Sequence, residues 1–147
     1  MRIELPDVAA MERYGARIAG VLRKGDVVAL DGGLGAGKTT LARAVLRALG
    51  YRDEVPSPTF TLIEAYDAPP LRLPVAHADF YRLEDPSELV EIGLDDYREG
   101  AALIVEWPDR AGGFAHEAAC LKITLEPAEE GRIAIASGGP DWLGRMP

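Results

Sequence analysis

Residues 32–39 read Gly-Gly-Leu-Gly-Ala-Gly-Lys-Thr, which matches the pattern G-x-x-x-x-G-K-[ST] at every specified position. Glycines let a backbone approach an anion closely, and the successive N–H groups of such a loop point toward phosphate oxygens. In this pattern the lysine, here Lys38, reaches the β- and γ-phosphates, and the hydroxyl of Thr39 is a ligand for Mg²⁺. The stretch therefore predicts a P-loop that binds a nucleoside triphosphate.

The residues around the loop have the order of strand, loop and helix that a phosphate site requires. Residues 27–30 form a short apolar run, which is typical of a strand buried on both faces. After the loop, apolar residues recur at helical spacing as far as Leu49, and Gly50 stands where a helix would end. The competing dinucleotide pattern G-x-G-x-x-G fails, because a match that starts at Gly33 places Lys38 at the third glycine.

The 147 residues are enough for one compact domain, which we expect to span residues 1–137. Residues 138–147 contain glycine and proline and are expected to form a short mobile tail. No apolar stretch reaches the length of a membrane span, and the N-terminus lacks the layout of a signal peptide. With Cys120 as the one cysteine, we expect a cytoplasmic protein without an internal disulfide.

The formal net charge is −8. Proteins bind nucleic acids largely because their Lys and Arg side chains displace the counterions of the phosphates. An acidic chain lacks this gain in free energy, so strong direct binding to DNA or RNA is not expected. Any connection with nucleic acid would run through a partner protein, and no association with a membrane is expected.

The remaining elements are predicted from periodicity and turn residues. Asp7 is expected to cap a first helix, and Pro74 argues that its strand lies at a sheet edge or contains a bulge. We expect strands at 60–66, 71–80 and 101–105, short helices at 86–92 and 94–98, and a hairpin of strands 121–125 and 132–136. The predicted class is a three-layer α/β P-loop NTPase fold, with a mixed, mainly parallel sheet and a C-terminal hairpin.

A second group of residues is predicted to complete the site. Glu106 ends the apolar strand 101–105, and ligands collect at the carboxyl ends of parallel strands, so it would lie beside the P-loop. There it would bind Mg²⁺ or one of its waters, the alternative being a carboxylate that faces solvent.

His77, Asp79 and Tyr81 point to one face if their strand continues. Asp79 is then either a second carboxylate near the metal and the attacking water or a half-exposed strand residue. His77 has no partner at the spacing of metal ligands and is predicted to be a hydrogen-bonded structural residue. Thr59 is either a threonine that approaches the γ-phosphate, as in switch loops, or a turn residue.

The chain contains no asparagine and no glutamine. A guanine-reading Asn-Lys-x-Asp motif and a glutamine that positions water are therefore impossible, which favours an adenine nucleotide. The arginines are scattered rather than gathered in the lid that a small-molecule kinase would need.

Four motifs occur together in an order that resembles the TsaE (YjeE) family, the small ATPase of bacterial tRNA threonylcarbamoyladenosine synthesis. They are Leu-Gly-Ala-Gly-Lys-Thr-Thr (34–40), Ser-Pro-Thr-Phe-Thr-Leu (57–62), His-Ala-Asp-Phe-Tyr-Arg-Leu (77–83) and Val-Glu-Trp-Pro (105–108). The resemblance runs from about Asp7 to Ser137. It implies a Mg²⁺-dependent ATPase that acts with TsaD and TsaB, the pair that transfers a threonylcarbamoyl group to N6 of an adenosine in tRNA.

The resemblance also implies roles for individual residues. Lys38 would bind phosphate, Thr39 and Glu106 would hold Mg²⁺, Asp79 would be the carboxylate needed for hydrolysis, and Thr59 would be the switch-like threonine. The implied ATP-binding residues are Met11, Gly33, Leu34, Gly35, Ala36, Gly37, Lys38, Thr39, Thr40 and Arg132.

Trp107 follows the metal-site glutamate as in the family, with a core indole as the alternative. Two positions depart from the family pattern. Many members have aspartate at Gly33, and a threonine that contacts the nucleotide is replaced by Met11, which could still pack on adenine.

The leading hypothesis is a partner-stimulated ATPase. The alternatives are a small-metabolite kinase and a nucleotide-dependent binding module that does not hydrolyse ATP.

Overall fold

The computed structural model describes residues 1–58 and 62–147 of the chain. Thr59, the expected switch-like residue, lies outside these ranges. The described elements are β1 (Arg2–Leu5), α1 (Val8–Val21), β2 (Val27–Asp31), α2 (Lys38–Leu49), β3 (Ile63–Tyr66), β4 (Val75–Asp79), α3 (Glu88–Ile92), α4 (Leu94–Arg98), β5 (Ala102–Glu106), the 3₁₀ helix η1 (Pro108–Ala111), β6 (Cys120–Pro127), β7 (Arg132–Gly138) and the 3₁₀ helix η2 (Pro140–Trp142).

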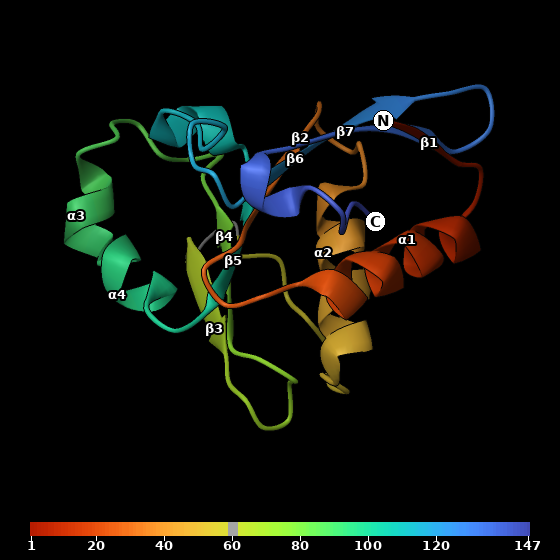
Figure 1. The fold of residues 1–147 in the computed structure, drawn as a ribbon. Helices are drawn as coiled ribbons and strands as arrows, with labels where there is room; N and C mark the ends of the chain where they lie inside the picture. Colours follow the sequence, from red (N-terminus) through yellow and green to blue (C-terminus); the bar gives the residue numbers. More distant parts are fainter. Residues whose placement is uncertain (59–61) are drawn as a thin grey trace.

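In the described ranges the strands form one seven-stranded sheet in the order β1-β7-β6-β2-β5-β4-β3 (Figure 1). The inner strands β6, β2, β5 and β4 run parallel, whereas β7, β1 and β3 pair antiparallel toward the margins. This arrangement confirms the predicted mixed sheet and its C-terminal hairpin, β6–β7. Because β2, β5 and β4 are parallel and adjacent, their carboxyl ends meet at one edge of the sheet.

Helices cover both faces of the sheet, as the three-layer class predicts (Figure 1). Alternate strand residues divide between two cores: Val28, Leu30 and Ile104 pack with α1 and α2, and Ala29 and Val105 belong to the core on the other face. The helices α1 and α2 approach closely because Gly15 carries no side chain, and a Cβ there would lie 2.5 Å from Ala44 Cβ.

The first helix begins as predicted. The side chain of Asp7 accepts a hydrogen bond from the backbone N–H of Ala10 at 2.8 Å, which satisfies a donor of the first turn. Met11, Tyr14 and Ile18 are buried along one stripe of the helix.

Two strands differ from the sequence-based expectation. The edge position predicted from Pro74 is wrong, because β4 lies between β5 and β3. Pro74 immediately precedes the strand, where its missing N–H costs no ladder bond, and its carbonyl accepts from Ala102 N at 3.0 Å. The strand β1 was not predicted, because residues Arg2–Leu5 are too few for a clear alternation.

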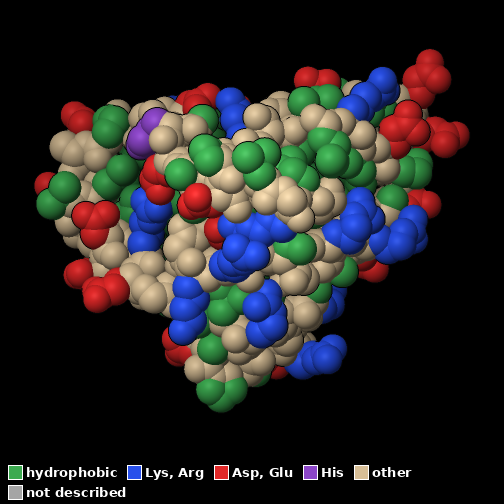
Figure 2. Space-filling view, in the orientation of Figure 1, with side chains coloured by type: hydrophobic (Ala, Val, Ile, Leu, Met, Phe, Trp, Pro, Cys, Tyr) green, Lys and Arg blue, Asp and Glu red, His purple; other side chains and the backbone are tan. Residues whose placement is uncertain are grey.

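Charge is distributed unevenly over the surface. In the view of Figure 2, Lys and Arg side chains lie across the lower middle of the face and over α1, whereas Asp and Glu lie over α3 and α4 at the left and again at the upper right. None of the helices within 1–58 and 62–147 is both long enough and apolar enough to cross a membrane.

The C-terminal residues are packed against the domain, which contradicts the expected mobile tail. Trp142 is fully buried, and its indole N–H donates to Ala119 O at 2.7 Å. The guanidinium of Arg145 lies 4.0 Å from the centre of the Trp142 ring and makes two hydrogen bonds of 2.7 Å with the buried carboxylate of Asp26. One large apolar side chain and one buried ion pair therefore anchor a segment whose composition resembles that of a tail.

We expect Trp142→Ala to lower the free energy of unfolding by about 3–5 kcal/mol, since it removes a fully buried indole. The neighbouring Leu143 is 81% exposed and provides a matched control. Leu143→Ala should change stability by no more than about 0.5 kcal/mol in urea unfolding followed by circular dichroism. Equal small effects of both substitutions would mean that the segment is not part of the core.

Candidate functional site

The loop between β2 and α2 has the shape of a P-loop, and α2 begins at Lys38. Gly32, Gly35 and Gly37 have φ values of 138°, 71° and 102°, which only glycine adopts without strain. At Gly32 there is also no room for a side chain, because a Cβ would lie 2.6 Å from Leu125 O. The loop directs the N-terminal end of α2 toward the carboxyl edge of the sheet, which favours an anion.

The ammonium of Lys38 lies over this loop. Nζ donates to the carbonyls of Gly32 and Gly33, each at 2.7 Å, and lies 4.1 Å from the centre of the Trp107 ring. Burial lowers the pKa of Lys38, while the neighbouring carboxylates, Glu106 foremost, act in the opposite direction. A buried cation is thus held by backbone carbonyl acceptors of the glycine-rich loop.

Glu106 lies beside the P-loop, where its strand position places it. Thr39 Oγ1 donates to Glu106 Oε1 at 2.7 Å, and the other carboxylate oxygen, Oε2, is 2.7 Å from His77 Nε2. Both Glu106 and His77 are buried, so the solvent-facing alternative for Glu106 does not hold. The two residues expected to hold Mg²⁺ are therefore in direct contact.

The chemistry of this pair fits Mg²⁺. Octahedral Mg²⁺ binds oxygens at 2.0–2.1 Å, so that adjacent ligands lie about 2.9 Å apart. The Thr39 and Glu106 oxygens are already 2.7 Å apart and need little movement to become such neighbours. In the described part of the chain no group of three or more His, Cys, Asp or Glu residues could hold a metal ion alone. Phosphate and water would therefore supply the other ligands, as is usual for Mg²⁺.

Asp79 lies at the same edge, in register with Glu106 on the neighbouring strand. It is buried, and its Oδ1 accepts from the backbone N–H of Tyr81 at 3.0 Å. The strand β4 ends at Asp79, so Tyr81 lies beyond it, where its ring packs on Trp107 with the centroids 5.0 Å apart. Burial excludes the reading of Asp79 as a half-exposed strand residue.

Trp107 adopts a left-handed backbone conformation, with φ of 57°. Its backbone N–H donates to Leu30 O at 3.3 Å, and its ring is only partly buried, between Lys38 and Tyr81. The indole is thus a wall of the site rather than a core side chain.

Two cavities of about 210 Å³ each lie on the two sides of the loop. The first, called the phosphate cavity after the ligand that the loop pattern predicts, is lined by Leu34, Gly35, Ala36, Gly37, Lys38, Thr39, Ser57, Asp79, Glu106 and Trp107. The second is walled largely by apolar side chains, and its lining is Leu5, Asp7, Val8, Met11, Gly37, Thr40, Gly131 and Arg132. Nearly all the residues implied by the resemblance therefore border one of two adjoining cavities, with Gly37 in both.

Arg132 reaches the P-loop from β7. Its guanidinium donates to Ala36 O at 3.0 Å and to Gly35 O at 2.9 Å, so it holds the loop backbone from outside. The sequence analysis did not identify Ser57, Leu5 or Val8 as residues that line the cavities. Leu5 is the last residue of the short strand β1, and Val8 is the first residue of α1.

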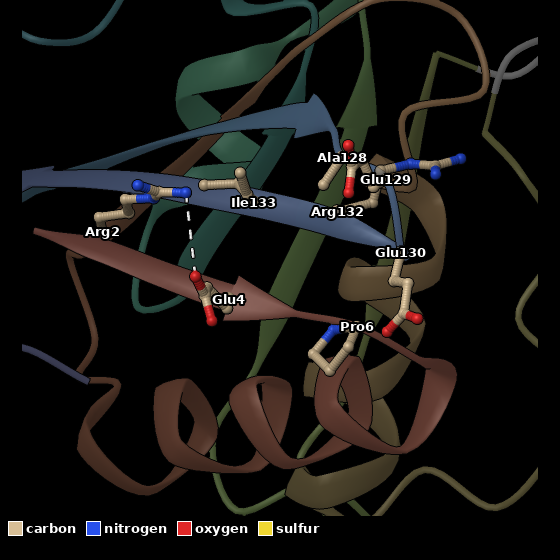
Figure 3. Close-up of a pocket in the computed structure, with 8 residues that line it drawn as sticks. All are labelled: Arg2, Glu4, Pro6, Ala128, Glu129, Glu130, Arg132 and Ile133. Carbon is tan, nitrogen blue, oxygen red and sulfur yellow. Dashed lines mark ion pairs between the residues drawn. The ribbon is translucent and has the colours of Figure 1, made fainter.

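A larger cavity of about 410 Å³ lies between β1 and the turn of the β6–β7 hairpin (Figure 3). Arg2 and Glu4 pair across part of it at 3.9 Å, Glu129 and Glu130 lie on the turn, and the Arg132 guanidinium points away (Figure 3). Its acidic groups do not suit phosphate, and it contains neither Lys38 nor Glu106. The candidate site is therefore identified by the side chains that line the smaller cavity and not by the volume of the cavity.

A mixed sheet with parallel inner strands, a P-loop after β2 and a carboxylate at the end of β5 define a protein with the P-loop NTPase fold. A family model described as "Threonylcarbamoyl adenosine biosynthesis protein TsaE" matches residues 5–134. The chain belongs to the TsaE family, which confirms the resemblance recognised in the motifs.

Individual relatives agree with this membership. The tRNA threonylcarbamoyladenosine biosynthesis protein TsaE of Haemophilus influenzae is 39% identical over 123 residues, which cover 80% of this chain and 77% of the relative. The TsaE of Streptomyces coelicolor is 42% identical over 102 residues, or 66% of each chain. A crystal structure of Bacillus subtilis YdiB superposes with a TM-score of 0.76 and 26% identity, covering 97% of this chain and 88% of that one.

The loop geometry distinguishes two adjacent glycines. Gly33→Asp introduces the residue that the family resemblance implies at this position, and a Cβ at Gly33 would have no heavy atom within 4 Å. We expect it to change the free energy of unfolding by no more than about 0.5 kcal/mol. Gly32→Ala should cost about 1–3 kcal/mol, because it combines a strained φ with a clash against Leu125 O. Urea unfolding of both variants tests this order, and a reversed order would contradict the loop geometry.

Proposed function

We propose that this protein is a Mg²⁺-dependent ATPase required for the N6-threonylcarbamoyladenosine modification of tRNA. It acts on, or regulates, a TsaD–TsaB threonylcarbamoyl transferase and is not itself the transferase. The observation that carries the proposal is the convergence of Lys38, Thr39 and Glu106 on one cavity at the carboxyl ends of the parallel strands. Membership of a threonylcarbamoyl adenosine biosynthesis family supports the pathway.

Two features support ATP as the nucleotide. The phosphate cavity adjoins a second cavity whose wall includes Met11 and Val8, which suits the faces of an adenine ring. The chain also lacks the asparagine that a guanine-reading motif requires. With phosphates in the loop, Lys38 would exchange its bonds to Gly32 and Gly33 for phosphate oxygens.

For hydrolysis, this chain supplies positioning and charge. Bound at Thr39 and Glu106, Mg²⁺ would offset the negative charge of the phosphates. Asp79 borders the same cavity and is placed to accept a proton from the attacking water. Among the residues that the structure describes, no arginine lines this cavity. Since an arginine at the γ-phosphate accounts for much of the rate in other P-loop enzymes, we propose a slow basal rate that a partner increases.

Action through a partner agrees with the charge of the chain. A protein with a formal net charge of −8 is a poor ligand for tRNA, so the protein that carries out the transfer would contact the RNA. A cytoplasmic location is part of this proposal.

Lys38→Ala should lower ATP hydrolysis by at least about 100-fold, because it removes the charge that stabilises the transferred phosphoryl group. The exposed Lys24 offers a matched control, and Lys24→Ala should leave the rate unchanged. Phosphate release is measured for the protein alone and with purified TsaD–TsaB, and the wild-type rate should rise with the pair.

Other results would redirect the proposal. Equal wild-type rates with and without TsaD–TsaB would refute stimulation. Labelled phosphate transferred to a small acceptor would indicate a kinase, and tight ATP binding without phosphate release would indicate a binding module.

A further inference from the structure

The proposed function makes no use of His77, although the imidazole is one of the most buried polar groups of the molecule, with no exposed surface. Its Nε2 lies 2.7 Å from Glu106 Oε2. The residue belongs to the motif around Asp79 but does not line the phosphate cavity. In the part of the chain that the structure describes, its side-chain hydrogen bond to the site is made to Glu106.

The sheet determines this contact. The strands β4 and β5 are adjacent and parallel, with His77 in register with Ile104 and Asp79 in register with Glu106. Every residue of both strands is buried. His77 and Glu106 are thus diagonal neighbours on the face that α2 covers, held by two inner strands rather than by a loop.

The direction of the hydrogen bond follows from the chemistry of the carboxylate. An ionised carboxylate only accepts, so the ring donates through Nε2. The other nitrogen, Nδ1, is buried without a hydrogen-bond partner in the described part of the chain. The bond to Glu106 is therefore the polar contact that accounts for a histidine at this position.

Each oxygen of the Glu106 carboxylate has its own partner, Thr39 at Oε1 and His77 at Oε2. If Thr39 Oγ1 and Glu106 Oε1 both held a cation, each would do so through a lone pair of its own oxygen. The hydrogen bond from His77 is made to the other oxygen and need not change. It can therefore hold the carboxylate in the same rotamer before and after the cation binds.

We propose that His77 is a positioning residue, which keeps Oε1 of Glu106 directed at Thr39, where these two oxygens would hold Mg²⁺. This inference rests on the proposed function and extends it to a residue outside the cavity. Partners that orient a metal ligand typically contribute 10–100-fold to metal affinity or activity. An effect of that size is expected here, with nucleotide binding itself unaffected.

Two substitutions separate the donor from the packing. The amide of His77→Gln can reach the place of Nε2 and donate to Glu106, whereas that of His77→Asn is too short. The exposed His116 provides the matched control His116→Asn. If circular dichroism shows that His77→Asn does not fold, His77→Phe replaces it, because phenylalanine keeps the ring volume and removes the hydrogen-bond donor.

The first readout is the affinity for the nucleotide. Binding is monitored through the fluorescence of Trp107, which borders the phosphate cavity. In EDTA all variants should bind ATP within about twofold of wild type. With Mg²⁺, His77→Asn should lose most of the metal-dependent gain in affinity, and its half-saturating Mg²⁺ concentration should rise by about 10-fold. His77→Gln should remain within about threefold of wild type.

The second readout is hydrolysis, where kcat of His77→Asn should fall by about 10-fold at saturating Mg²⁺ while KM for ATP stays near the wild-type value. Wild-type Mg²⁺ dependence and kcat in His77→Asn would overturn the proposal, as would a Gln variant no better than the Asn variant. A weaker affinity for ATP already in EDTA would also overturn it, since that indicates a general structural defect. These results concern only His77, whereas failure of the wild-type protein to bind and hydrolyse ATP would refute the proposed function itself.

Discussion

The parallel pairing of β2, β5 and β4 is the constraint on which the rest of the site depends. Leu30 is in register with Glu106, and Glu106 with Asp79, so that the P-loop and both carboxylates emerge at one edge of the sheet. The backbone N–H of Trp107 donates to Leu30 O and extends this pairing by one residue beyond the strand. A change of register by one residue would turn Glu106 to the other face of the sheet and separate it from Thr39.

Buried charge is concentrated at this edge. The buried polar and charged side chains of the described residues are Asp26, Lys38, His77, Asp79 and Glu106. Asp26 is paired with Arg145, far along the chain, and anchors the C-terminus. The other four surround or contact the phosphate cavity, although burying charge opposes folding. Four buried ionisable side chains around one cavity are expected where a charged ligand binds.

Many elements of the fold and part of the candidate site could be predicted from local sequence patterns. The P-loop, the helix after it, the Asp7 cap, the two short helices and the C-terminal hairpin depend on residues that are near neighbours in the chain. The end of an apolar strand was likewise enough to place Glu106. The predictions failed where the signal was weak or where distant contacts decided the outcome. The strand β1 is too short to show a period, Pro74 was read as an edge signal, and the tail is held by Trp142 and Arg145.

The sequence by itself determined the class of fold, the glycine-rich loop before α2 and the family, because each is encoded in contiguous residues with a specific spacing. Only the tertiary structure decided which side chains meet. The hydrogen bonds from Thr39 and His77 to Glu106 join residues 67 and 29 positions apart. The bonds from Arg132 to the P-loop cross 96 and 97 positions. Such contacts follow from strand order and register, which depend on the packing of the whole sheet and not on any local pattern.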